Sequence, residues 1–344
     1  MLTLAGLAGL AFVIWESNMT DDQIESEEFF VLLEKLMRTP TAPFREQKVR
    51  ETVTAEVAKV PKLSVRQDPW GNLLISHEGG NLNGGCVFCA HMDHPGFVDD
   101  AFLGSIRPEY LQESNCVTRF DAGIGMWDLP AFERVDGWIR SRACDDLVGC
   151  GVALAAVFHH ARTQSPCNVH ALLTVAEEVG LFGAALACVG GLVPRDSTVI
   201  SLETSPALSE AQFHAGCIVR VGDKRSIFSP SVTQSLMVAA GDWGIKHQRK
   251  LMDGGSCEGS IFWKAGYQTG ALCVALGNAH NQGPAGKIAM EYVSEVDVIE
   301  MLRLAIAAPS AVSECDEGLL ESVEKVADCA RREFSIRTEK NHKS

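Results

Sequence analysis

The sequence predicts an α/β protein with a mostly parallel central sheet flanked by helices and a small β-rich inserted domain. After residue 143, helical and strand patterns alternate, as in a parallel sheet whose strands are connected by helices. Short runs of consecutive apolar residues, such as 85–90, are typical of strands buried on both faces. Between residues 97 and 142 the helical pattern fades, and short apolar runs alternate with Gly, Pro, Asn and Asp, which favours a small β-rich insertion.

The individual elements follow from hydrophobic periodicity and from the residues that interrupt it. Apolar side chains from Phe29 to Met37 recur at helical spacing, and the segment Thr39–Pro43 ends that pattern. A second helix is predicted over residues 46–60, and residues 68–76 predict a turn followed by a strand. Later helices are predicted at 147–161, 181–189, 231–240 and 296–308, and later strands at 168–175, 197–202 and 269–276.

These patterns divide the chain into one discontinuous main domain and an insertion. Residues 19–96 and 143–334 are expected to form the main domain, interrupted by the insertion at 97–142, and residues 335–344 to form a frayed tail. The first 18 residues stand apart, because Met1 to Trp15 is almost wholly apolar yet lacks the basic start of a signal peptide and is short for a membrane span. A true start at Met19, an export leader and a membrane anchor all remain open.

Composition and charge narrow the classes of partner. The 344 residues are 46% hydrophobic and 22% charged, which is typical of a soluble globular protein with a large core. The formal net charge of −14 and the lack of a Lys/Arg-rich stripe argue against nucleic acid or an anionic membrane as the main partner. The 12 cysteines are scattered singly along a long chain, which favours reduced thiols and a cytoplasmic protein.

Acidic and imidazole side chains concentrate in five short segments, each of which follows a predicted strand or begins a predicted helix. Charged side chains placed directly after apolar strands are costly unless they are paired or bound to metal. Because the ends of parallel strands meet at one edge of a sheet, the five segments predict a shared cation site. They are residues 90–96 (AHMDHPG), 143–149 (ACDDLVG), 176–180 (AEEVG), 202–205 (LETS) and 277–281 (GNAHN).

Adjacent acidic residues suggest a division of roles within this site. Asp93, two residues after His91, is placed to orient a metal-binding imidazole. Glu177 and Glu178 point apart, so that one can bind metal while the other faces substrate as a general base. Each segment also has a purely structural interpretation, since a Glu pair can be a solvated helix start and the pair at 145–146 can cap the following helix.

The arrangement as a whole resembles the co-catalytic zinc exopeptidases, and most closely the glutamyl and deblocking aminopeptidases whose members form tetrahedral shells. The resemblance covers about residues 25–310. It rests on six motifs in the family's order: His91-Met-Asp93, Asp145-Asp146, Glu177-Glu178-Val-Gly, Glu203, Gly254-Gly-Ser256 and His280.

The resemblance implies a site for two divalent metal ions, with zinc expected first and cobalt or manganese also compatible. His91 and Glu203 would hold one ion, Glu178 and His280 the other, and Asp145 would bridge both. Mixed imidazole and carboxylate ligands suit these metals.

The resemblance also implies roles for residues that do not bind metal directly. Asp93 would support His91, and Glu177 would be the general base. A cis peptide bond is expected between Asp145 and Asp146, as it follows the bridging aspartate in that family.

Three departures from the family pattern affect what is carried over. Glu203 stands where the closest relatives usually carry Asp, which leaves the metal preference open. Cys257 follows the Gly-Gly-Ser loop where Asp is usual, so a substrate contact from this loop is in doubt. The insertion at 97–142 is short for the family's assembly domain, so dimers or other small homo-oligomers are expected in place of a closed shell.

Together these features predict a di-zinc metallo-aminopeptidase acting on peptides or small acylated amino compounds. A carboxypeptidase or a deacylase of N-acyl amino acids is the alternative within the superfamily, and it needs a cation for the substrate carboxylate. Arg220, Lys224, Arg225 and Arg249 leave that alternative open. A non-catalytic binding protein on the same fold is the alternative from another class, and the complete ligand set with Glu177 argues against it.

Overall fold

We analysed a computed structural model, which describes residues 22–80, 85–113, 116–207, 211–313 and 331. The predicted leader at 1–18 and tail at 335–344 lie outside the described residues.

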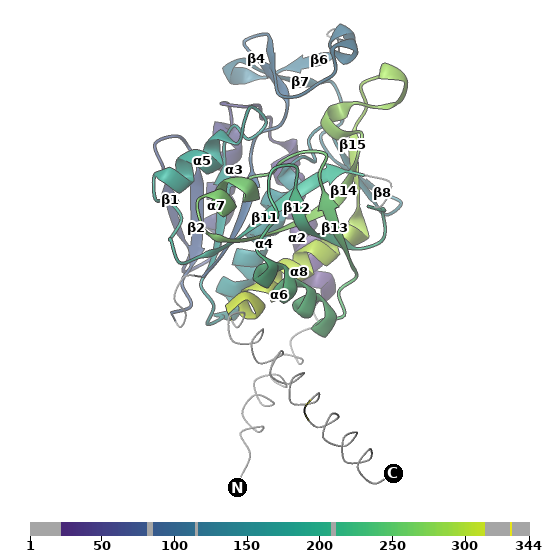
Figure 1. Ribbon diagram of the computed structural model, residues 1–344. Coiled ribbons are helices and arrows are strands. Elements are labelled where there is room, and N and C mark those ends of the chain that lie inside the picture. The colour runs from purple at the N-terminus through teal and green to yellow at the C-terminus, as the bar shows by residue number, and fades with distance from the viewer. Residues whose placement is uncertain (1–21, 81–84, 114–115, 208–210, 314–330, 332–344) are drawn as a thin grey trace, which may run out of the picture.

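A large sheet runs through the described part of the molecule and is flanked by helices, which confirms the predicted fold class (Figure 1). Its strands lie in the order β1-β2-β10-β3-β11-β14-β15-β9-β8, with β12 also pairing with β14, and β13 with β12. The strands of this sheet are β1 Ser64–Gln67, β2 Leu73–His77, β3 Cys86–His91, β8 Glu133–Val135, β9 Trp138–Ser141, β10 Val169–Thr174, β11 Thr198–Pro206, β12 Cys217–Asp223, β13 His247–Met252, β14 Gln268–Gly277 and β15 Glu291–Ser294.

The parallel part of the sheet is its centre. Strands β10, β3, β11 and β14 are parallel to one another, whereas β1, β2, β15, β9 and β8 pair antiparallel at the edges. The central strands are connected through helices, which bring the chain back to the same end of the sheet before each new strand. Their carboxyl ends therefore meet at one edge, where four of the five predicted segments begin.

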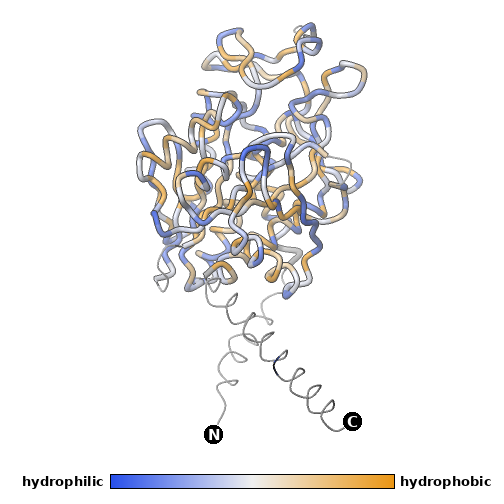
Figure 2. Tube along the Cα trace, viewed as in Figure 1, coloured by the Kyte–Doolittle hydropathy of each residue, from blue (hydrophilic) through white to orange (hydrophobic). Residues whose placement is uncertain are grey.

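Helices cover both faces of the sheet. Alternate residues of β3 pack on opposite sides: Phe88 joins the core beneath α2, α3, α4, α6 and α8, while Cys89 joins a smaller core beneath α5 and α7. In Figure 2 apolar segments run through the main body of the molecule, and hydrophilic segments are frequent in its outer loops. The helices are α2 Asp22–Arg38, α3 Gln47–Val57, α4 Leu147–Thr163, α5 Phe182–Val189, α6 Pro230–Asp242, α7 Gly259–Lys264 and α8 Glu295–Ser313.

A small four-stranded antiparallel sheet stands above the main sheet in Figure 1, in the order β5-β4-β7-β6. Its strands are β4 Gly96–Val98, β5 Ala101–Leu103, β6 Val117–Arg119 and β7 Ile124–Trp127. The stretch predicted as one insertion supplies both sheets, because β8 and β9 pair with each other and β9 pairs with β15 of the main sheet. Short 3-10 helices complete the described elements at Pro108–Glu113, Asp121–Gly123, Ala279–Asn281 and Pro284–Gly286.

Candidate metal centre

Two histidines from different strand ends point their imidazoles at the same place. His91 is the last residue of β3, and its Nδ1 lies 3.0 Å from the backbone oxygen of Asp93. His280 follows β14, and its Nδ1 lies 2.7 Å from the backbone oxygen of Ser105 in the segment after β5. A carbonyl oxygen accepts only, so each Nδ1 carries a proton, and in the neutral ring Nε2 offers the lone pair that a metal ion needs.

The carboxylate of Asp145 lies between these two imidazoles. Its Oδ1 is 3.4 Å from Nε2 of His91, and its Oδ2 is 3.5 Å from Nε2 of His280. The peptide bond between Asp145 and Asp146 is cis, as the resemblance implies. The two oxygens of one side chain thus face two separate histidines.

Glu178 completes a group around His280. Its Oε2 is 3.4 Å from Nε2 of His280, and ligand atoms of Asp145, Glu178 and His280 all lie within 4.8 Å of one another. One imidazole and two carboxylates therefore surround a single position.

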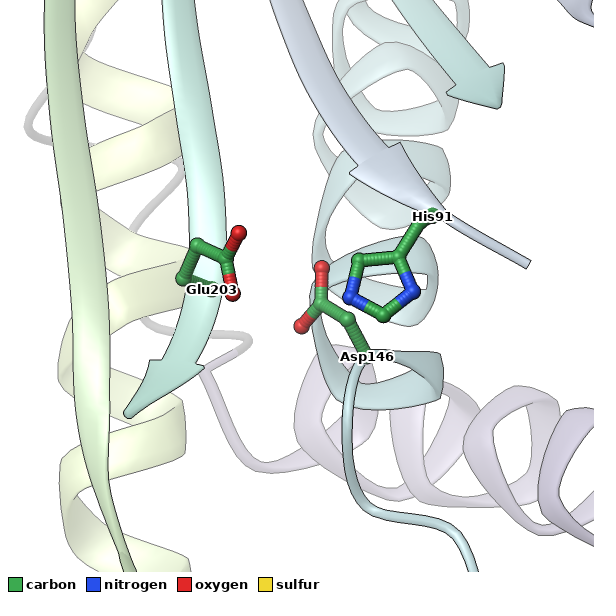
Figure 3. A group of neighbouring side chains, drawn as sticks. All are labelled: His91, Asp146 and Glu203. Atoms are coloured by element: carbon green, nitrogen blue, oxygen red, sulfur yellow. The ribbon is translucent and has the colours of Figure 1, made fainter. Parts of the chain in front are cut away.

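A second group surrounds the other histidine. His91, Asp146 and Glu203 converge from the end of β3, the start of α4 and β11 (Figure 3), with ligand atoms within 4.8 Å of one another. Asp146 serves the helix as well, because its Oδ1 accepts the backbone N–H of Gly149 at 3.1 Å. From the sequence, the possible role of Asp146 was to cap the following helix. The structure adds Asp146 to the residues that could hold metal.

Glu177 also lies at this site, in a third group with His91 and Glu178. Its Oε2 is 4.0 Å from Nε2 of His91. The backbone N–H groups of Glu177 and Glu178 donate to Oδ1 and Oδ2 of Asp93, at 3.0 and 3.2 Å. Asp93 thus fixes the segment that carries both glutamates, in addition to lying 3.6 Å from Nδ1 of His91.

The electrostatics of the site show an excess of buried negative charge. Burial raises the pKa of Glu178 to about 7 and that of Glu203 to about 8, and the nearby Asp145 carboxylate adds to both shifts. Burial, Glu203 and Glu178 raise the pKa of Glu177 well above its usual range. Although burial opposes it, the imidazoles of His280 and His91 lower the pKa of Asp145. Cations bound here would offset this charge.

The residues present fit divalent metal ions. Three buried carboxylate oxygens accept no hydrogen bond within the described part of the chain: Asp145 Oδ1, Asp146 Oδ2 and Glu178 Oε1. Buried carboxylate oxygens are normally paired, so unpaired ones at a point where two imidazoles converge indicate a missing partner. Imidazole with carboxylate suits zinc, cobalt and manganese.

Other residues singled out in the sequence have structural contacts. His94 is buried, with Nδ1 2.6 Å from the backbone oxygen of Asp145. His214 lies beside the ring of Trp138, with ring centroids 4.6 Å apart, and is in none of the three groups. Cys257 is buried, and its backbone N–H donates to Asp223.

Sequence reasoning missed three buried carboxylates around the site. Glu46 accepts the backbone N–H of Ala176, Glu258 accepts the hydroxyl of Thr174, and Glu291 accepts the backbone N–H of His280. All three lie outside the five acidic segments singled out in the sequence.

Comparison with known proteins identifies the family. The profile of the M42 glutamyl aminopeptidases matches residues 124–297, just over half of the chain. The chain belongs to the M42 glutamyl aminopeptidase family. The match contains Asp145, Asp146, the Glu177–Glu178 pair, Glu203 and His280.

Relatives agree with this membership. A protein of Acetivibrio thermocellus named "Putative aminopeptidase" is 23% identical over 342 residues, covering 83% of this chain and 99% of that protein. Aminopeptidase APDkam598 from the archaeon Desulfurococcus kamchatkensis has a TM-score of 0.69 at 19% identity, covering 85% of this chain and 98% of that one. The TET1 peptidase of Pyrococcus horikoshii has a TM-score of 0.67 at 18% identity, covering 82% and 99%.

The M42 chain is therefore an aminopeptidase whose site offers groups for metal binding. Among its described residues, no helix is both long and apolar enough to cross a membrane.

Proposed function

We propose that this M42 chain is a two-metal aminopeptidase that removes N-terminal residues from peptides. The observation that carries the proposal is the position of Asp145, whose two oxygens face Nε2 of His91 and Nε2 of His280. Such a carboxylate is placed to bridge two ions. His91 with Asp146 and Glu203 would hold one ion, and His280 with Glu178 would hold the other.

The ions would act as Lewis acids on the scissile carbonyl and lower the pKa of the attacking water, with zinc our first assignment and cobalt or manganese compatible. Glu177 takes a proton from that water and passes it to the departing amine. Its backbone is fixed by Asp93, so the carboxylate is held beside the ligands without any need to bind metal itself.

The positions of the basic residues favour an aminopeptidase over a carboxypeptidase or deacylase. Arg220 is buried and donates from Nη1 to the hydroxyl of Ser205 at 3.2 Å. Lys224, Arg225 and Arg249 are exposed. The buried carboxylates of the site instead suit a free α-amine, which carries positive charge.

We infer a cytoplasmic enzyme from the dispersed cysteines, and the described thiols are free.

A substrate panel with parallel metal analysis tests this proposal. We expect hydrolysis of free-amine peptides, much slower hydrolysis of the same peptides with blocked N-termini, and loss of turnover in chelator that returns with added zinc, cobalt or manganese. Preference for N-acyl amino acids would favour the deacylase. Unchanged turnover in chelator, or fewer than two bound ions in excess metal, would overturn the two-metal mechanism.

A further inference from the structure

One buried carboxylate outside the three metal-binding groups is hydrogen-bonded to two of the proposed ligand segments. Glu291 has no exposed surface. Its Oε2 accepts the backbone N–H groups of Cys144 and Asp145, at 2.7 and 3.1 Å. Its Oε1 accepts the backbone N–H of His280 at 2.7 Å. A single side chain thus joins the segment that carries the bridging carboxylate to the segment that carries the second histidine.

The sheet explains why Glu291 reaches both segments. It begins β15, which pairs antiparallel with β9 on one side and β14 on the other. Glu291 lies opposite Ser141, the last residue of β9, and the chain continues from there to Asp145. On the other side, β14 ends at Gly277, three residues before His280. The side chain therefore starts between the two strands that lead to the two ligands.

The segment that carries His280 needs outside support because its local backbone does not fix it. His280 has a φ of 55°, in the left-handed region that non-glycine residues rarely adopt. Such a conformation persists when its surroundings impose it, and the hydrogen bond from His280 N–H to Glu291 is one such constraint.

His94 holds the same two segments from another direction. Its Nδ1 lies 2.6 Å from the backbone oxygen of Asp145, and its Nε2 lies 3.1 Å from Oδ1 of Asn281, the neighbour of His280. Nδ1 of His94 is also 3.9 Å from Oε2 of Glu291. The N–H and the C=O of Asp145 are therefore both held, which fixes the direction of its carboxylate.

We propose that Glu291 is a positioning residue of the metal centre, which sets the separation between Asp145 and His280 before any ion binds. The inference rests on the proposed two-metal function. It assigns to Glu291 no contact with metal or substrate: it acts only through the backbone of the residues that make those contacts.

The test compares Glu291→Gln with Asp297→Asn in the full-length protein. The Gln side chain carries an NH2 group in place of one oxygen, and this group cannot accept a hydrogen bond. Either the N–H of His280 or the N–H groups of Cys144 and Asp145 therefore lose their acceptor. Asp297 is a matched control, because it is buried and accepts the N–H groups of His214 and Gly216, both at 2.7 Å, without contacting a metal group. Asp297→Asn is expected to lower thermal stability only.

Zinc affinity, measured by competition with a chromophoric chelator, is the main readout. We expect Glu291→Gln to weaken the affinity for at least one ion by roughly 10- to 100-fold, the usual effect of losing a group that orients ligands. The visible absorption spectrum of the cobalt-substituted protein should also change, since it reports ligand geometry. Asp297→Asn should keep wild-type affinity and spectrum.

Glu291→Asp covers the case in which the Gln variant does not fold. It keeps the charge but is shorter by one methylene, so it no longer reaches both segments, and it should also lose affinity. A folded Gln or Asp variant with wild-type zinc affinity and cobalt spectrum would overturn the proposal. If wild type binds fewer than two ions, the two-metal function fails instead, so the two failures are distinguishable.

Discussion

At the scale of single residues, Glu177 and Glu178 are neighbours in sequence with different surroundings. Oε2 of Glu178 lies 3.4 Å from Nε2 of His280, at a distance suited to sharing an ion, whereas Oε2 of Glu177 lies 4.0 Å from Nε2 of His91. The backbone N–H groups of both glutamates donate hydrogen bonds to the Asp93 carboxylate, so the two residues differ in the positions of their side chains. This supports ligand and base as separate roles.

The substitutions Glu177→Gln and Glu178→Gln test this division. Glu177→Gln keeps the shape of the side chain and removes its basicity, so turnover should fall by roughly 100- to 10,000-fold while two ions stay bound. Glu178→Gln replaces an anionic ligand by a neutral amide and should weaken the second ion. Kinetics with metal analysis decide the assignment. Loss of metal from the Glu177 variant, with retention by the Glu178 variant, would show the roles to be exchanged.

At the scale of elements, the segment between strands β5 and β6 of the small sheet packs on the loop that carries His280. The backbone oxygen of Ser105 accepts from His280, and the hydroxyl of Tyr110 donates to the backbone oxygen of Gly283 at 2.6 Å. Arg107 donates to Tyr110 and to Gln282, which joins the two segments further. The small sheet thus contributes to the metal centre through a neighbouring loop.

Tyr110→Phe should therefore affect both stability and metal binding. Tyr110 is buried, and removing its hydroxyl leaves the backbone oxygen of Gly283 without a hydrogen-bond donor. This costs about 1–3 kcal/mol in free energy of unfolding. Because that loop carries His280, zinc affinity should fall as well. Denaturant unfolding and chelator competition measure the two effects.

Tyr267→Phe is the matched control for this change. Its hydroxyl also donates to a backbone oxygen, that of Val193 at 3.0 Å, but in the separate core beneath α5 and α7. It should lose comparable stability and keep zinc affinity. Equal zinc affinity in both variants would show that the packing of the small sheet does not reach the metal centre.

At the scale of the whole molecule, we expect the assembly state to depend on the region between β3 and α4. The TET1 peptidase of Pyrococcus horikoshii assembles into a tetrahedron or a large octahedral shell. In this chain the region between β3 and α4 forms a small sheet of short strands, and its last two strands extend the main sheet. Strands β8 and β9 are thus held in the main sheet.

We accordingly expect a dimer or another small homo-oligomer. Light scattering on the purified full-length protein measures the mass directly. A mass of about twelve subunits would show that a short insertion is enough for a closed shell.

The sequence by itself determined most helices, the central strands of the sheet and the order of the site residues. The helical spacing at Phe29–Met37 and the apolar run at 85–90 reflect local burial, which a sequence pattern records. A residue directly after a buried strand of a parallel sheet is confined to one edge of that sheet. His91, Glu178 and His280 could be placed together for that reason, and Asp145 was included because it begins a predicted helix. The family resemblance added their roles, which periodicity does not encode.

Only the tertiary structure decided what lies around those residues. Asp146 caps α4 and also faces Glu203, which depends on how α4 packs against β11. Glu291 binds the backbone of Asp145 and His280 because β15 inserts between β9 and β14, and antiparallel edge pairing of this kind leaves no periodic signal. Contacts between residues more than a hundred positions apart are set by strand order and register, which short-range patterns do not contain.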